Sequence, residues 1–334
     1  MRTFKHHIVP FLLLLVAASC RVDKYVPQGD KLYAGSKIRM AHGKESASIM
    51  EDLQEFARPK ANRSFLGVKY QLILFNLFEE PKSNKGFVYT VKHKWGEPPS
   101  LLSQAQPERS ARRMEDYYFG IGHFHTRVTY TVHDSGKDAH VDYLVDKGPQ
   151  WLIGKVVLPS DSGQLFDMIR EAHDSTLLRT GEPFVLDVLS KERERIDARL
   201  KKVGYYFFNP EFLLFRVDST RSGVVDVYLT VKGEAPHQGL QPWSLGDIRV
   251  YGNYRVERDS AIRSEAGLKS GRFYYIDTDE TYKSSVFKRA VTLREGQLYS
   301  KDLHSLTIER LMNLNNFRFV RLHFDPTDTV RHIM

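Results

Sequence analysis

Apolar residues along this chain follow a repeated order of spacings. Stretches with an apolar residue at every third or fourth position lead to a Gly or Asn corner, and stretches with an apolar residue at every second position follow. The first spacing places side chains on one face of a helix, and the second places them on one face of a strand. Gly and Asn tolerate the left-handed backbone that often ends a helix. The pattern therefore predicts a helix followed by two strands.

This predicted order of helix, corner and strands occurs in three copies. The helical stripes contain Ala111, Met114, Tyr118 and Ile121; Val185, Leu189, Ile196, Leu200 and Val203; and Leu303, Thr307, Leu311 and Leu314. The corners lie at residues 122–124, 204–206 and 315–317. The alternating residues are Val128, Tyr130 and Val132 with Val141, Tyr143 and Val145; Leu213, Phe215 and Val217 with Val225, Val227, Leu229 and Val231; and Val320, Leu322 and Phe324.

A further strand, and in two copies a further helix, is predicted ahead of each stripe. The strands are expected at residues 32–40, 151–158 and 245–251, and the helices at 46–56 and 164–178. Each copy is then a strand-helix-helix-strand-strand unit in which two helices cover one face of a small sheet. The predicted fold class is α+β, built as tandem modules.

Pro and Gly residues mark the expected domain boundaries. We expect a signal peptide at 1–20, a tether at 21–30, a first module at 31–148 with a long insertion at about 58–106, a second module at 149–233, a linker at 234–242 and a third module at 243–334. The last strand of the third module would have only residues 330–334. The sequence therefore predicts a truncated third module and no membrane β-barrel in this chain.

The N-terminus has the features of an export signal. Arg2 and Lys5 precede an apolar run at residues 8–18, which is too short to span a bilayer, and Cys20 follows small residues. A cysteine at this position indicates lipidation of Cys20 after cleavage, so that the lipid anchors the protein in a membrane. The alternative is an ordinary signal peptide with a chance cysteine.

Composition narrows the possible functions. The chain has 334 residues, 41% of them hydrophobic, one cysteine and a net charge of +8. One cysteine excludes an internal disulfide, a cysteine-ligated zinc site and an iron–sulfur cluster. The basic charge is compatible with nucleic acid or an anionic membrane surface as a partner, and the export signal argues against nucleic acid. The charged residues from Glu182 to Lys202, on what looks like one helix, are expected on a solvated face.

No catalytic, cofactor or metal site is predicted. His123 and His125 have no carboxylate at ligand spacing, and the corner position of His123 favours packing. Ser285 and Lys288 spell a serine-nucleophile motif without its partner motifs. Asp277 and Asp279 are interpreted as loop acids, and Gly120 with Gly122 as a helix end. The apolar runs at 72–77 and 273–275 are either core or exposed patches, with core favoured for the first.

Several stretches carry a resemblance to a known family. They are the opening from Cys20 to Leu32, the Gly-Glu-Pro sequences at 96–99 and 181–184, and above all residues 295–300 and 310–319. Together they resemble TamL-type lipoproteins of the BamA/TamA outer-membrane assembly superfamily, and the modules resemble its POTRA domains. The resemblance implies a non-enzymatic periplasmic arm of a translocation and assembly machine, anchored by lipid to the outer membrane. It also implies a TamB-like inner-membrane partner.

The mechanism that the resemblance implies is β-augmentation of unfolded outer-membrane β-barrel clients. The client would add to an open sheet edge at about residues 126–132, 212–217 and 318–324. The expected contact residues are Arg127, Val128 and Tyr130; Phe215, Arg216 and Val217; and Arg318, Val320 and Leu322. The alternative is a periplasmic lipoprotein that scaffolds an envelope complex without handling clients. A secreted hydrolase is a third interpretation, without a supporting constellation.

Overall fold

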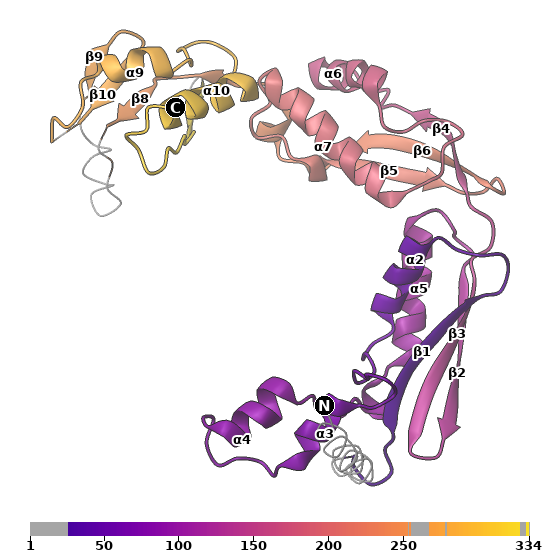
Figure 1. Ribbon diagram of the computed structural model, residues 1–334. Helices are drawn as coiled ribbons and strands as arrows, with labels where there is room; N and C mark the ends of the chain where they lie inside the picture. The colour runs from indigo at the N-terminus through magenta and orange to yellow at the C-terminus, as the bar shows by residue number, and fades with distance from the viewer. Residues whose placement is uncertain (1–25, 253, 255–266, 278, 328–331, 334) are drawn as a thin grey trace, which may run out of the picture. The chain divides into compact units, whose positions relative to one another are not determined.

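The computed structural model describes residues 26–252, 254, 267–277, 279–327 and 332–333. The predicted signal peptide and Cys20 lie outside the described residues. Contacts divide the chain into one unit that ends at Gln150 and a second that begins at Trp151. Among the described helices, none is long and apolar enough to cross a membrane. The chain is an α+β protein, as predicted, and Figure 1 shows its helices and sheets.

The first unit contains a module with the predicted order of elements. Strand β1 (Leu32–Met40) pairs in parallel with β3 (Asp138–Asp146), and β2 (Arg127–Ser135) pairs antiparallel with the other side of β3. The sheet order is therefore β1-β3-β2. Helices α2 (Ala47–Phe56) and α5 (Pro107–Gly120) cover one face of this sheet (Figure 1).

Burial confirms the predicted helical stripe of the first module. Met114 and Tyr118 of α5 are fully buried and pack with Leu53 of α2 and Val141 of β3. Ser46 begins α2 because its hydroxyl accepts a hydrogen bond from the backbone N–H of Ile49 at 3.3 Å. The sequence thus identifies both helices, and its spacing identifies the face that α5 buries.

The insertion of the first module forms short helices. They are α3 (Tyr70–Leu77), α4 (Phe87–Tyr89), a π-helical turn (Thr90–Trp95) and a 3-10 turn (Leu102–Gln104). Lys92 is buried because its ammonium donates to the carbonyls of Phe75 and Phe78, each at 3.0 Å, at the end of α3. Leu72 is fully buried, whereas Leu77 is half exposed, so the run at 72–77 is only partly core.

The second module, within the second unit, repeats this architecture. Its strands are β4 (Leu152–Val157), β5 (Leu213–Asp218) and β6 (Val224–Val231), in the order β4-β6-β5. Its elements outside the sheet are α6 (Gln164–Ala172), α7 (Leu186–Lys202) and the 3-10 turns His173–Ser175 and Pro210–Phe212. Leu189, Ile196 and Leu200 of α7 are buried against the sheet, as the stripe predicts.

The expectation that every charge on α7 is solvated is wrong. Glu192 is 2% exposed and Asp197 is 7% exposed. The Glu192 carboxylate accepts from the Thr176 hydroxyl at 2.8 Å, the Leu177 N–H at 3.0 Å and the Arg195 guanidinium at 2.7 Å. Burial alone would raise the pKa of Glu192, but these hydrogen bonds outweigh it and lower that pKa. The loop after α6 needs a hydrogen-bond acceptor, and α7 supplies one.

The third module keeps the same helix order but has shorter ladders. Two helices, α9 (Ser285–Ala290) and α10 (Lys301–Met312), lie near a sheet of β8 (Arg249–Tyr251), β10 (Phe273–Ile276) and β9 (Leu268–Ser270). A second sheet joins β11 (Pro326–Thr327), β12 (His332–Ile333) and β7 (Ser244–Leu245). The 3-10 turn His237–Leu240 precedes them. Phe273 is 1% exposed, so the run at 273–275 belongs to a strand in the core.

Two predictions for the third module are wrong. The expected first strand at 245–251 is divided between β7 and β8, which belong to different sheets. The expected edge strand at 318–324, with Arg318, Val320 and Leu322, is extended chain without a β-ladder. Its alternation is nevertheless present, because Val320 and Leu322 are partly buried and Phe324 is buried. Side-chain alternation alone does not make a strand where no neighbouring backbone lies within pairing distance.

Aromatic residues join the second and third modules inside the second unit. The Tyr206 ring lies 4.8 Å from the rings of both Tyr299 and Phe324, and Phe207 lies 5.1 Å from Trp243. Gly204 has a φ of +106°, and a Cβ there would lie 2.9 Å from Pro242. The predicted corner at 204–206 therefore ends α7 and also packs against the next module.

Candidate functional site: the free sheet edges

In each module, one edge of the first strand is covered by the loop that precedes the second long helix. In the second module, the Ile153 N–H donates to the Glu182 carbonyl and the Gly181 N–H donates to the Ile153 carbonyl, both at 2.8 Å. The Phe184 N–H donates to the Trp151 carbonyl at 2.9 Å. The Gly-Glu-Pro-Phe sequence at 181–184 thus occupies this edge of β4.

The same covering occurs in the other two modules. The Tyr33 N–H donates to the Ser100 carbonyl in the first, and the Leu245 N–H donates to the Gln297 carbonyl in the third, both at 2.8 Å. Isolated bridges pair Leu32 with Leu101, Leu152 with Pro183, and Ser244 with Leu298. The stretches 181–184 and 295–300, which stand out in the sequence, therefore occupy the outer edge of the first strand, and in the first module residues 100–102, just after the Gly-Glu-Pro sequence at 96–99, do so.

The opposite edge is open in the first two modules. Strand β2 pairs with β3 on one side, and β5 pairs with β6 on one side; neither has a second β-partner among the described residues. On β2, only Val128 is buried. An edge strand of this kind presents unpaired N–H and C=O groups to any extended chain that approaches it.

Hydrogen bonds show which residues of the open edges face outward. The Val128 N–H donates to the Glu115 carboxylate of α5 at 2.8 Å and so points away from β3. Alternate residues of an antiparallel strand direct their backbone groups to the same side, so the backbone N–H and C=O groups of Tyr130 and Val132 also point away from β3. On β5, the Lys232 N–H donates to the Phe212 carbonyl at 2.8 Å. By the same alternation, the backbone N–H and C=O groups of Phe215 and Val217 point toward the open edge.

The structure thus brings the predicted edge residues of the first two modules onto open edges. Tyr130 is 42% exposed and Val217 is 49% exposed, so apolar surface accompanies the free backbone. Arg127 and Arg216 are exposed and place a cation on each strand. The Arg193 guanidinium lies 5.7 Å from the Phe215 ring, which is largely buried. Charges of this kind limit indiscriminate strand pairing.

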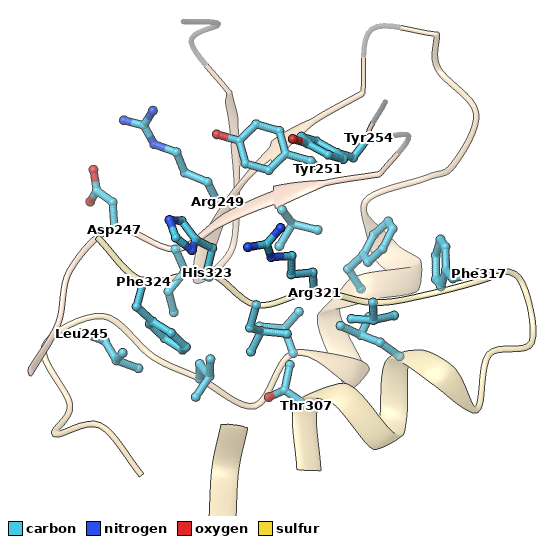
Figure 2. A pocket seen from close by; sticks show the side chains of 18 of the residues that line it. Leu245, Asp247, Arg249, Tyr251, Tyr254, Thr307, Phe317, Arg321, His323 and Phe324 are labelled. Atoms are coloured by element: carbon cyan, nitrogen blue, oxygen red, sulfur yellow. The ribbon is translucent and has the colours of Figure 1, made fainter. Parts of the chain in front are cut away.

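In the third module, a groove of about 470 Å³ lies beside residues 319–325, where most of the edge strand was expected. Figure 2 shows the extended chain with Phe317, Arg321 and Phe324 on one side and β8 with Arg249 and Tyr251 on the other. Val320 and Leu322 line the groove, whereas Arg318 does not. Sequence reasoning missed this groove, because it arises from the missing ladder between two stretches that were both expected to be strands.

The groove has an apolar floor and charged residues along its lining. Phe287, Val291 and Leu311 contribute to its apolar lining and are buried. Asp247, Arg249, Arg321, His323 and Asp325 contribute charge or hydrogen-bonding capacity. His323 Nε2 lies 2.8 Å from the Asp325 carboxylate.

Of the residues that the sequence raised for chemistry, His123 and Asp277 have structural roles. His123 is buried, and its Nδ1 lies 3.1 Å from the carbonyl of Gly148. Ser285 and Lys288 are exposed on α9, away from the groove lining. The Asp277 carboxylate accepts from the Tyr275 hydroxyl and the Tyr282 N–H, both at 2.9 Å, and thereby orders a turn. Residue 278 between the two aspartates lies outside the described residues.

No protein-family model matches the chain, and no curated protein matches it. Solved structures do resemble it. The crystal structure of POTRA3-5 of Haemophilus influenzae BamA is 15% identical, covers 92% of this chain and 96% of its own, and has a TM-score of 0.41. POTRA1-3 of Omp85 from Anabaena is 13% identical, covers 91% and 93%, and has a TM-score of 0.30.

A third similar structure is the N-terminal domain of Omp85 from Thermosynechococcus elongatus. It is 12% identical, covers 92% of this chain and 95% of its own, and has a TM-score of 0.28. These identities are too low to transfer a function. The functional proposal therefore depends on the sheet edges and their hydrogen bonds.

Proposed function

We propose that this protein is a non-enzymatic periplasmic arm of an outer-membrane protein translocation and assembly machine, lipid-anchored through Cys20. The arm binds extended client strands by β-augmentation along β2 and β5. The observation that carries the proposal is the asymmetry of the sheets: the same loop covers one edge in each module, while the other edge is open in the first two.

The asymmetry favours strand capture for a physical reason. Backbone hydrogen bonds do not depend on the side chains of the client, so an open edge accepts many sequences. Apolar side chains at Tyr130 and Val217 add contact surface beside the outward-facing backbone. Clients of this chemistry are unfolded β-barrel proteins, whose strands are extended and alternate apolar with polar residues. A TamB-like inner-membrane partner remains part of the proposal, on the resemblance alone.

Proline substitution tests the open edge with a matched pair of positions. Tyr130→Pro removes an outward-facing N–H, whereas Thr129→Pro removes an N–H that belongs to the β2–β3 ladder. We expect Tyr130→Pro to leave the fold intact and to weaken binding of a urea-denatured outer-membrane barrel protein about tenfold. Tyr130→Ala keeps the N–H and should retain most of the binding. Equal binding by Tyr130→Pro and the unmodified protein would contradict the proposal.

Photo-crosslinking separates the client-binding role from that of a fixed scaffold. A photoreactive residue at Val217 on the open edge is compared with one at Leu152, which is 37% exposed on the covered strand β4. A client-binding arm should give many crosslinked barrel proteins from Val217 and few from Leu152. A single crosslinked partner from Val217 would favour the scaffold instead.

Lipidation is tested by Cys20→Ala, which should release the protein from membranes in a carbonate wash.

A further inference from the structure

Two imidazoles and a carboxylate meet on the sheet of the first module, near the turn between β2 and β3. His133 Nε2 lies 3.6 Å from Asp142 Oδ2, and His140 Nε2 lies 3.6 Å from Asp142 Oδ1. The two rings are stacked, with centroids 4.9 Å apart and planes 19° apart. One possible ligand atom from each residue lies within 4.8 Å of the other two.

The register of the hairpin explains why these side chains meet. His133 of β2 lies directly opposite His140 of β3, and Thr131 lies opposite Asp142. Residues at i and i+2 of a strand share a face, so His140 and Asp142 project together and His133 joins them from the neighbouring strand. Val141 and Tyr143 alternate with them and are buried in the core. The three polar groups therefore lie on the opposite face of the sheet.

The carboxylate in this cluster lacks a full set of partners. Asp142 Oδ1 is buried as an atom and has no hydrogen-bond partner among the described residues. The Arg39 guanidinium lies 3.7 Å from Asp142 Oδ2, and its side chain is 67% exposed. A buried carboxylate oxygen without a partner is costly, and a bound cation would satisfy it.

We propose that His133, His140 and Asp142 form a Zn²⁺ site. Zinc takes imidazole nitrogen and carboxylate oxygen at about 2.0–2.2 Å in tetrahedral geometry, which places neighbouring ligand atoms about 3.4 Å apart. The two His–Asp separations are close to this value already, and small χ rotations bring the nitrogens together. Water completes the fourth position. Mixed nitrogen and oxygen ligands favour zinc over Ca²⁺ and Mg²⁺, which prefer oxygen alone.

Zinc here acts as a clamp on the β2–β3 hairpin. The ligands come from both strands, so bound metal opposes the separation of β2 from β3 near the turn at Gly136. Because metal binds the folded hairpin and not the unfolded chain, binding raises the stability of the first module. This inference does not depend on client binding: His133 alternates along β2 with the residues whose backbone faces the open edge, and His140 and Asp142 lie on β3.

Zinc titration of the full chain tests the site. Isothermal titration and Co²⁺ absorption should show one more equivalent of bound metal per chain for the unmodified protein than for the double variant His133→Ala/His140→Ala. Asp142→Asn, which keeps the shape of the side chain, should weaken the affinity at least tenfold. Saturating Zn²⁺ should raise the melting temperature of the first module by about 5 °C in the unmodified protein only. Ca²⁺ and Mg²⁺ should not bind.

His42 supplies a matched control, because it is exposed and lies on the same module outside the cluster. His42→Ala should leave the zinc stoichiometry and affinity unchanged. Circular dichroism of each variant separates loss of ligand from loss of fold. The same stoichiometry and affinity for the unmodified protein and His133→Ala/His140→Ala would overturn the proposal. So would a loss that His42→Ala reproduces.

Discussion

The second and third modules have the same order of helices and the same order of strands, yet their sheets differ greatly in length. In the second, β6 pairs with β4 within residues 224–228 on one side and with β5 at residues 226–231 on the other. In the third, β12 pairs with β7 and β11 through only two residues on each side. In both sheets the last strand along the chain lies between the first and the middle one, so this strand order does not depend on the length of the ladders.

The difference shows what side-chain alternation can and cannot determine. Val320, Leu322 and Phe324 turn toward the core of the third module, just as Leu213 and Phe215 are buried on β5. Hydrophobic burial places both stretches, but only β5 has a neighbouring strand to receive its hydrogen bonds. The third module compensates with aromatic contacts, including Tyr206 from the second.

Charged substitutions in the two cores should give the largest contrast. Ile196→Asp places a carboxylate among the buried residues of the second module and should unfold it, with a loss of at least about 4 kcal/mol. Leu311→Asp in the third module should cost less, because its core is open to the groove. Urea titration followed by fluorescence and circular dichroism measures both losses.

The exposed face of α7 supplies the control for these substitutions. Glu194 is exposed, so Glu194→Ala should change the free energy of unfolding by no more than about 0.5 kcal/mol. Similar losses from Ile196→Asp and Glu194→Ala would contradict the stripe. Similar losses from Ile196→Asp and Leu311→Asp would mean that the two cores are equally complete.

Amide exchange should resolve the same contrast at the backbone. Amides of β6 belong to a ladder with partners on both sides and should exchange only when the module unfolds. Amides at 318–324 have no ladder and should exchange at least about 100-fold faster. Uniform protection through Phe324 would mean that this stretch pairs in solution and that the groove is closed.

Much of the fold follows from the sequence because spacing reports burial. Met114, Tyr118 and Ile196 lie where the stripes place them, and β1 has the predicted bounds, because each element buries one continuous face. The open edges of β2 and β5 were expected from the resemblance and agree with the strand order. The burial of Glu192 could not be predicted, since the partners at 176–177 come from another part of the chain.

The candidate sites show the same limit. A groove depends on where two stretches fail to pair, which no local pattern reports. The cluster of His133, His140 and Asp142 depends on hairpin register. A signal for it is present in the sequence, because two strands joined by a short turn place His133 opposite His140 if the turn residues are Gly136 and Lys137. Register, more than composition, therefore reveals the possible metal ligands.

The smallest expected difference between the two modules is the pH at which each begins to lose stability on acidification. In the third, burial and the nearby Lys301 lower the pKa of His304 below its ordinary value of 6.5. In the second, the pKa of Glu192 is lowered below 4.5. A group whose pKa is lower in the folded state contributes stability at pH values above its unfolded-state pKa. That stability is lost as the pH falls from the unfolded-state pKa through the folded-state pKa. The third module should therefore begin to lose stability below pH 6.5, and the second only below pH 4.5.

Two substitutions assign these pH effects to their residues. His304→Phe keeps an aromatic ring beside Tyr299 and Phe324 and should remove the loss that begins at pH 6.5. Glu192→Gln cannot ionise, so it should remove the acid-dependent loss of the second module while costing about 1–3 kcal/mol at neutral pH. Amide exchange at several pH values follows both modules in one sample. If β6 lost protection before the third module did, the assignment would be reversed, and the charged contacts of α7 would be the weaker part of the second unit.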